Sequence, residues 1–167
     1  GRIQQMDARV RNTTSFAAPA DGVLSEGQVE RYLAVSRRVM ADIEGRFAVL
    51  EERYEDVSSD RVTFAGFREA ASAWAELLRL VVDAKETQVA ALNDAGFSTS
   101  EYAWVRRQVM EAAGVPLFQV DLAALLENDL DPTERGDVEP APPANVQLVA
   151  PYGQEIERLV PLAVFGL

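Results

Sequence analysis

A long run of apolar positions, spaced alternately by four and three residues, dominates the pattern along this chain. Its members are Val29, Leu33, Ser36, Met40, Ile43, Phe47, Leu50, Tyr54 and Val57, and only Ser36 is polar. This spacing keeps one stripe of an α-helix turned toward a partner helix over many turns. The pattern therefore predicts a helix from Ser25 to about Val57, and Ser25 with Gln28 forms a capping box at its start.

A second stripe of the same kind predicts an antiparallel partner for this helix. It consists of Phe64, Phe67, Ala71, Trp74, Leu78, Val81, Lys85, Gln88 and Leu92, and Gly96 follows as a left-handed stop. Two consecutive long helices with a short turn near residue 59 lie antiparallel, so the numbers of facing residues sum to about 119. This register sets Trp74 against Gly45 and Ala71 against Phe47, the alternation of large and small that an interdigitated core requires.

The rest of the chain predicts shorter helices and one interruption. Ser98 and Glu101 form a second capping box for a helix that ends at Gly114, and a further helix is expected over 117–127. An acidic, Pro-rich stretch over 127–144 predicts an exposed loop, and a last apolar segment capped by Asn145 contains two prolines that should kink or divide it. The expected fold is all-α: an antiparallel up-and-down bundle of about four helices built on the long hairpin.

The domain organisation follows from the same pattern. A short helix is expected over 3–11, and the Pro, Gly and small side chains that follow it predict a flexible N-terminal arm or linker over residues 1–23. Residues 24–167 form a single helical-bundle domain, with the 127–144 loop inside it. The weakly basic, Ser/Thr/Ala/Pro-containing start is compatible with an exported bacterial protein, periplasmic or lipid-anchored through this arm. A cytosolic protein is nearly as compatible with it.

Charge and composition narrow the classes of partner and chemistry. The formal net charge of −11 argues against a nucleic acid or an anionic membrane surface as partner, and no stretch is long and apolar enough to span a membrane. The chain has no Cys and no His, which removes disulfides, thiolate nucleophiles, zinc–thiolate sites and the usual general base and haem ligand. No phosphate-binding loop or nucleophile elbow is present. We therefore expect no catalytic residue, cofactor or metal site.

Only one level of the two long stripes is clearly polar, and it holds the first candidate site. Ser36 of the first helix meets Lys85 and Gln88 of the second at the level that the register predicts. One interpretation is a polar pocket in which Lys85 binds an anion or acts as a base. The alternatives are that Lys85 extends to solvent while Val82 and Val89 complete the seam, or that the layer only sets the helix register.

A second candidate lies on the third predicted helix. Trp104 with Arg106 and Arg107 has the composition of a protein-interaction face, since exposed Trp and Arg dominate binding hot spots. The more common interpretation is that Trp104 packs into the bundle core.

Two acidic clusters are further candidates for cation sites. Asp129, Asp131 and Thr133 resemble the start of a calcium loop, but Glu134 stands where such a loop needs Gly, and Pro140 where it needs Glu. A group of carboxylates near the end of the first long helix could in principle hold a divalent ion, namely Glu51, Glu52, Glu55, Asp56 and Asp60. A solvated acidic surface is the simpler interpretation of both.

Three hypotheses for function follow from these patterns. The first is a non-enzymatic helical module that binds an unknown protein or small molecule through a helical groove or the Trp104 face. The second is a cytosolic adaptor or chaperone-like bundle that dimerises through the heptad stripe. The third, an enzyme that uses carboxylates or Lys85, comes last because the residues that enzymes use most are missing.

Overall fold

The computed structural model describes residues 1–54, 64–115 and 140–167, with side chains for all of these except 50–54 and 64–74. In chain order the helices are α1 (Arg2–Asp7), α2 (Glu26–Tyr54), α3 (Phe64–Ala95), α4 (Thr99–Ala112), α6 (Pro143–Val149) and α7 (Gly153–Val164). A 3₁₀ turn, η2 (Ala150–Tyr152), joins the last two. Within the described residues there is no strand, and the helices pack against one another, so the predicted all-α bundle is confirmed.

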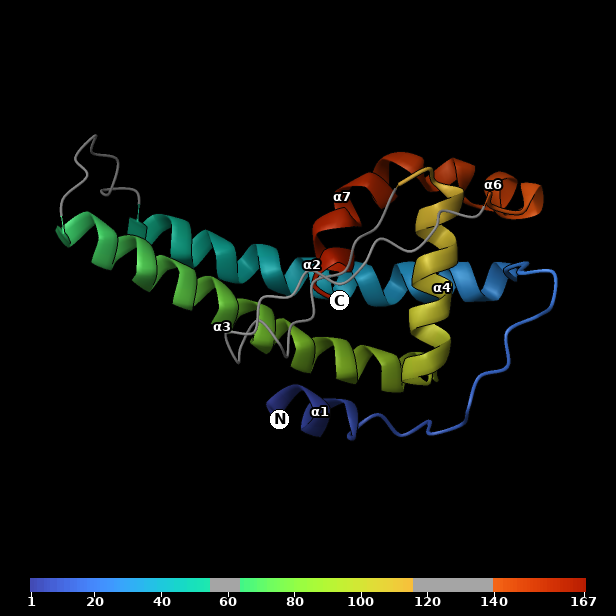
Figure 1. Cartoon of the computed structure of the whole chain (residues 1–167), viewed down its shortest axis with the longest axis horizontal. Coiled ribbons are helices and arrows are strands. Elements are labelled where there is room, and N and C mark those ends of the chain that lie inside the picture. The colour runs from blue at the N-terminus through green and yellow to red at the C-terminus, as the bar shows by residue number, and fades with distance from the viewer. Residues whose placement is uncertain (55–63, 116–139) are drawn as a thin grey trace.

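The two long helices form the predicted hairpin and run side by side along the molecule (Figure 1). At one end the other helices surround them and form a compact head, whereas at the other end the pair projects beyond the head (Figure 1). The exposure of the heptad stripe differs between its two ends: Val29, Leu33 and Ser36 are each 1% exposed, whereas Phe47 is 48% exposed. The expected pairings of Trp74 with Gly45 and of Ala71 with Phe47 involve side chains outside the described residues.

The start of α4 follows the signals in the sequence. Gly96 adopts a φ of 73° and ends α3, and the Ser98 side chain accepts a hydrogen bond from the Glu101 backbone N–H at 3.1 Å. Phe97 then packs edge-on against Tyr102, with 5.5 Å between the ring centroids, which is the hydrophobic contact expected beside such a cap. These contacts turn the chain so that α4 crosses the hairpin (Figure 1). It contacts α2, α6 and α7 there.

The N-terminal residues differ from the expected loose arm. Met6 and Val10 are each 3% exposed and belong to the hydrophobic core, and α1 packs on α3. Ile3, Met6 and Val10 are spaced by three and four residues, so a short helix can present all of them to one side. The backbone N–H of Arg11 also donates to Asn93 Oδ1 at 2.7 Å. Part of the 1–23 segment is therefore built into the head.

The C-terminal segment is divided as its prolines predict, although its start differs. Pro151 lies in η2 and separates α6 from α7, whereas Pro161 lies within α7. The first of these helices begins at Pro143, which suits the first turn of a helix because proline needs no backbone N–H there. Asn145 is consequently inside α6 and is not its cap. The predicted helix over 117–127 and most of the acidic loop lie outside the described residues.

Candidate functional site

The structure brings together the three residues of the predicted polar layer. Ser36 of α2 and Gln88 of α3 are each 1% exposed, so both lie in the interior of the head. Lys85, one turn before Gln88, donates from Nζ to Gln88 Oε1 at 2.7 Å. Gln88 in turn donates from Nε2 to the carbonyl oxygen of Gly166 at 3.0 Å. This layer therefore links α3 to the C-terminal segment.

An acidic residue that the sequence reasoning did not connect with this layer completes it. Asp7, the last residue of α1, forms an ion pair with Lys85, with 2.9 Å between Nζ and Oδ1. The Lys85 side chain is 12% exposed, so it does not extend freely into solvent as one alternative proposed. Val82 and Val89 are buried as that same alternative expected. Lys85 is thus held between a carboxylate and an amide oxygen.

The polar layer continues through two buried tyrosines. Tyr32 of α2 and Tyr102 of α4 have ring centroids 5.6 Å apart and are 1% and 2% exposed. Burial raises the pKa of both hydroxyls, while Ser36 and Arg106 act in the opposite direction on each pKa. Ser36 and Gln88 are near enough to the Tyr102 hydroxyl to lower its pKa, yet this hydroxyl has no well-aligned hydrogen bond among the described residues.

Arg106 lies beside the buried Tyr102 and does not form the predicted interaction face. It is 5% exposed, with its guanidinium carbon 5.5 Å from the centre of the Tyr102 ring, and its buried Nε has no hydrogen-bond partner in the described part of the chain. Trp104 is 8% exposed and packs on Phe16 at 5.2 Å between centroids, so the core interpretation holds for it. Of the three predicted residues only Arg107 is exposed. Helix α4 is covered on several sides, which explains why its Trp and one Arg are not at the surface.

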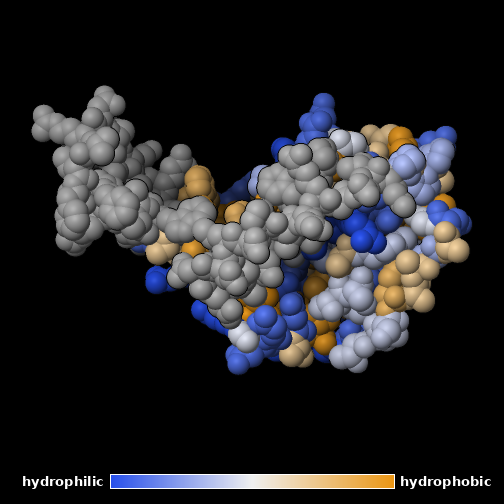
Figure 2. Space-filling view, in the orientation of Figure 1, coloured by the Kyte–Doolittle hydropathy of each residue, from blue (hydrophilic) through white to orange (hydrophobic). Residues whose placement is uncertain are grey.

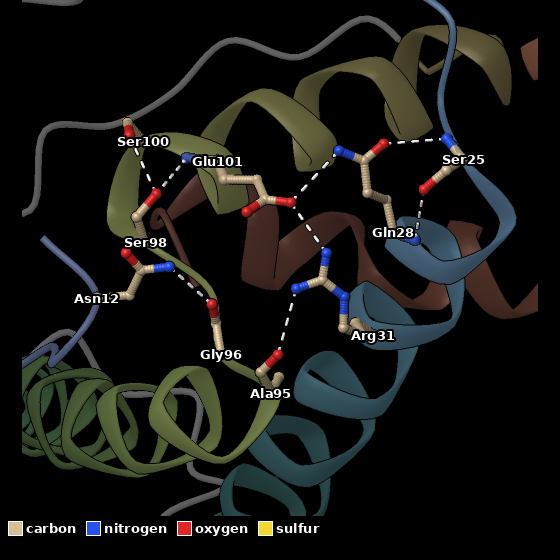
Figure 3. A network of polar contacts seen from close by, with 9 residues as sticks. All are labelled: Asn12, Ser25, Gln28, Arg31, Ala95, Gly96, Ser98, Ser100 and Glu101. Atoms are coloured by element: carbon tan, nitrogen blue, oxygen red, sulfur yellow. Dashed lines mark hydrogen bonds and ion pairs between the residues drawn. The ribbon is translucent and has the colours of Figure 1, made fainter. Parts of the chain in front are cut away.

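A separate polar network fastens the three helix ends that meet in the head (Figure 3). Arg31 of α2 forms an ion pair with Glu101 of α4 at 2.9 Å and donates to the Ala95 carbonyl oxygen at 3.2 Å. Gln28 also donates to Glu101 at 3.3 Å, while its side chain and that of Ser25 complete the predicted capping box. The Arg31 guanidinium lies 4.2 Å from the centre of the Phe97 ring. These contacts join groups of this chain to one another, which indicates a structural role.

Among the side chains of the long helices that the structure describes, the most exposed large apolar ones lie near the end of α2. Every residue from 44 to 49 is exposed, and Phe47 and Val49 are 48% and 58% exposed. We call Phe47 and Val49 the arm surface. By contrast, the visible face of the head is a mixture of hydrophilic and hydrophobic residues (Figure 2). The arm surface was not singled out in the sequence, because Phe47 was assigned to the sealed seam.

Among the described residues, no group of three or more His, Cys, Asp or Glu residues is placed to hold a metal ion. The carboxylates near the end of the first long helix and the Asp129–Thr133 motif lie outside the side chains that the structure describes. In the described part of the chain, no helix is both long and apolar enough to cross a membrane.

Comparison with known proteins gives no relative from which a function could be inferred. A function therefore has to be inferred from the fold and from these contacts. No family model matches the chain, and no curated protein or solved structure is significantly similar to it. The class of protein that the fold defines is an all-α bundle with a projecting helical hairpin.

Proposed function

We propose that this chain is a non-enzymatic helical binding module that engages a protein partner through the arm surface. The observation that carries the proposal is the exposure of Phe47 and Val49 on the part of α2 that projects beyond the head. Single exposed apolar residues are ordinary, but these two stand two positions apart on α2 and face different sides of it. A partner that buries both therefore encloses the projecting helix, as a groove does. Burying their exposed fractions would contribute on the order of 2 kcal/mol.

The polar residues near the arm surface support recognition of a protein. Arg46, between the two apolar residues and the head, forms ion pairs with Asp42 at 3.0 Å and Asp83 at 3.4 Å. The first pair lies within α2, and the second joins α2 to α3 at the level where the hairpin leaves the head. A hairpin stiffened in this way can offer its apolar side chains to the groove or helix of a partner without ordering itself first.

The contacts of the polar layer favour a binding module over an enzyme. Lys85, the residue that the enzyme hypothesis needs, already bonds Asp7 and Gln88. The adaptor hypothesis required dimerisation through the heptad stripe, yet Val29 and Leu33 of that stripe are buried within the chain's own head. A dimer would therefore have to form at the arm surface, where photo-crosslinking from Phe47 detects it.

Site-specific photo-crosslinking tests the proposal. A benzoylphenylalanine side chain replaces Phe47 in one variant and Val146 in the other, and Val146 is a matched control because it is apolar and 44% exposed on α6 of the head. In cells of the source organism, the Phe47 probe should yield one discrete adduct that the Val146 probe does not yield. Adding Val49→Asp should lower that yield at least tenfold, because a charge at the contact is costly to bury.

The mass of the adduct distinguishes the outcomes. An adduct with a different protein supports the binding module, and an adduct of twice the mass of the chain supports the dimeric adaptor instead. The proposal is wrong if the two probes give the same adducts, or if the Phe47 probe gives none.

A further inference from the structure

Arg106 brings hydrogen-bond donors into the interior of the head. Arginine carries five N–H donors and no acceptor, and the buried Nε of Arg106 has no partner among the residues that the structure describes. The Tyr102 hydroxyl, one helical turn earlier on α4, is also buried without a well-aligned partner. Buried polar groups are hydrogen-bonded in most proteins, so two such groups on one helix face require an explanation.

The charges around this point show the same imbalance. Arg106 is buried in the head, whereas Lys85 is partly buried and pairs with Asp7. Three carboxylates of the surrounding helices pair with other arginines: Glu101 with Arg31, Glu155 with Arg37, and Asp94 with Arg38. Within the part of the chain that the structure describes, no ion pair neutralises Arg106.

A purely structural explanation of Arg106 is weak. A buried cation without a counter-ion destabilises the fold, and an apolar side chain of similar volume would serve packing better. Its guanidinium instead lies over the Tyr102 ring, which orients it but supplies no acceptor. The planar guanidinium is the group that proteins use to bind carboxylate and phosphate, and one N–H of this one is unpaired among the described residues.

We propose that Arg106 and Tyr102 form a binding site for a small oxyanion, the carboxylate or phosphate group of a ligand with few atoms. The oxyanion accepts hydrogen bonds from the Arg106 guanidinium and the Tyr102 hydroxyl, and its charge offsets that of Arg106. Ser36 and Gln88 line the same layer and supply further polar contacts. This inference does not depend on the arm surface, because the two features lie in different parts of the molecule.

Thermal unfolding and titration calorimetry of the full chain test this site. Acetate, phosphate and sulfate are each compared with chloride at equal ionic strength and pH. At least one oxyanion should raise the Tm with increasing concentration, because a ligand that binds only the folded state stabilises it. Acetate and phosphate distinguish a carboxylate ligand from a phosphate ligand.

Variants locate the effect. Arg106→Met should weaken binding of the active oxyanion at least tenfold and leave the Tm without the ligand unchanged or higher, because it removes a buried unpaired charge. Tyr102→Phe should weaken binding several-fold. Arg107→Met is the matched control: it removes the same charge from the neighbouring exposed residue and should leave binding unchanged.

Two results would overturn the proposal. One is that none of the three oxyanions raises the Tm above chloride. The other is that Arg107→Met weakens binding as much as Arg106→Met, which would reduce the effect to general charge screening. If Arg106→Met fails to fold, Tyr102→Phe with Arg107→Met still decides between a site and general screening.

Discussion

The ammonium group of Lys85 lies 2.9 Å from Asp7 Oδ1, so the first short helix is bonded to the middle of α3. We predict that Asp7→Asn lowers the free energy of unfolding by about 1–3 kcal/mol. The reason is that the Lys85 side chain, which is 12% exposed, would keep its charge without its counter-ion. Urea denaturation followed by circular dichroism measures the change.

A neighbouring pair between the same two parts of the chain is the control. Arg9 and Glu86 lie 3.7 Å apart with side chains 63% and 51% exposed, so Glu86→Gln should change stability by less than about 0.5 kcal/mol. Lys85→Met should cost less than Asp7→Asn because it leaves no buried charge. Equal losses for Asp7→Asn and Glu86→Gln would mean that the Asp7–Lys85 pair behaves as a surface pair.

The second prediction concerns Asn145, which is 0% exposed and connects α6 to the segment before α2. Its Oδ1 accepts from the Leu24 backbone N–H at 2.8 Å, and its Nδ2 donates to the Gly22 carbonyl oxygen at 2.9 Å. Asn145→Ala should destabilise the protein by about 2–4 kcal/mol, because the Leu24 N–H is left buried without an acceptor. Asn12→Ala removes a more exposed amide and should cost under about 1 kcal/mol. Comparable losses in the two variants would contradict the prediction.

Alkaline pH should destabilise the head through its buried tyrosines. Burial raises the pKa of both Tyr32 and Tyr102. Because the folded-state pKa lies above the unfolded value of about 10, the resulting stabilisation is fully present below that pH and is lost as pH rises above it. Each residue contributes a slope of up to about 1.4 kcal/mol per pH unit in that window. Tyr32→Phe should reduce the slope of unfolding free energy against pH, and an unchanged slope would rule out its contribution.

Glycines in two different backbone conformations provide the fourth prediction. Gly96 has a φ of 73°, so Gly96→Ala should cost about 1–2 kcal/mol through backbone strain. Gly27 lies within α2 with nothing within 4 Å of an added Cβ, so Gly27→Ala should be neutral or stabilise by about 0.5 kcal/mol. The two Tm values measured side by side should therefore move apart, and a shared direction would contradict the backbone argument.

The parts of the fold that depend on local spacing could be predicted from the sequence. The stripes through Leu33 and Leu92 gave the hairpin, and the register near residue 59 brought Ser36 to the level of Gln88. The caps at Ser25 and Ser98 were also predictable, because a capping box is a contact between residues three apart.

The contacts that complete the site could not be predicted in this way. Asp7 reaches Lys85 from a segment assigned to a linker, and no spacing rule relates residues so far apart in sequence. Arg106 was placed at the surface because arginine usually lies there, although its position four residues after Tyr102 puts both on the same helix face. The exposure of Phe47 depends on where the head ends, which is a property of the tertiary packing.

One turn of α3 contacts two segments that are far apart in sequence. Lys85 pairs with Asp7, and Gln88 donates to the carbonyl oxygen of Gly166, which lies 78 residues after Gln88. On the ribosome these partners emerge at different times. At roughly 5–20 residues per second, about 4–16 s separate the synthesis of Gln88 from that of Gly166. During this interval the hairpin can form from local contacts while its buried polar turn is still open to the solvent. The head of this protein therefore closes only after Gly166 has been made, and chaperones have those seconds in which to bind the nascent hairpin.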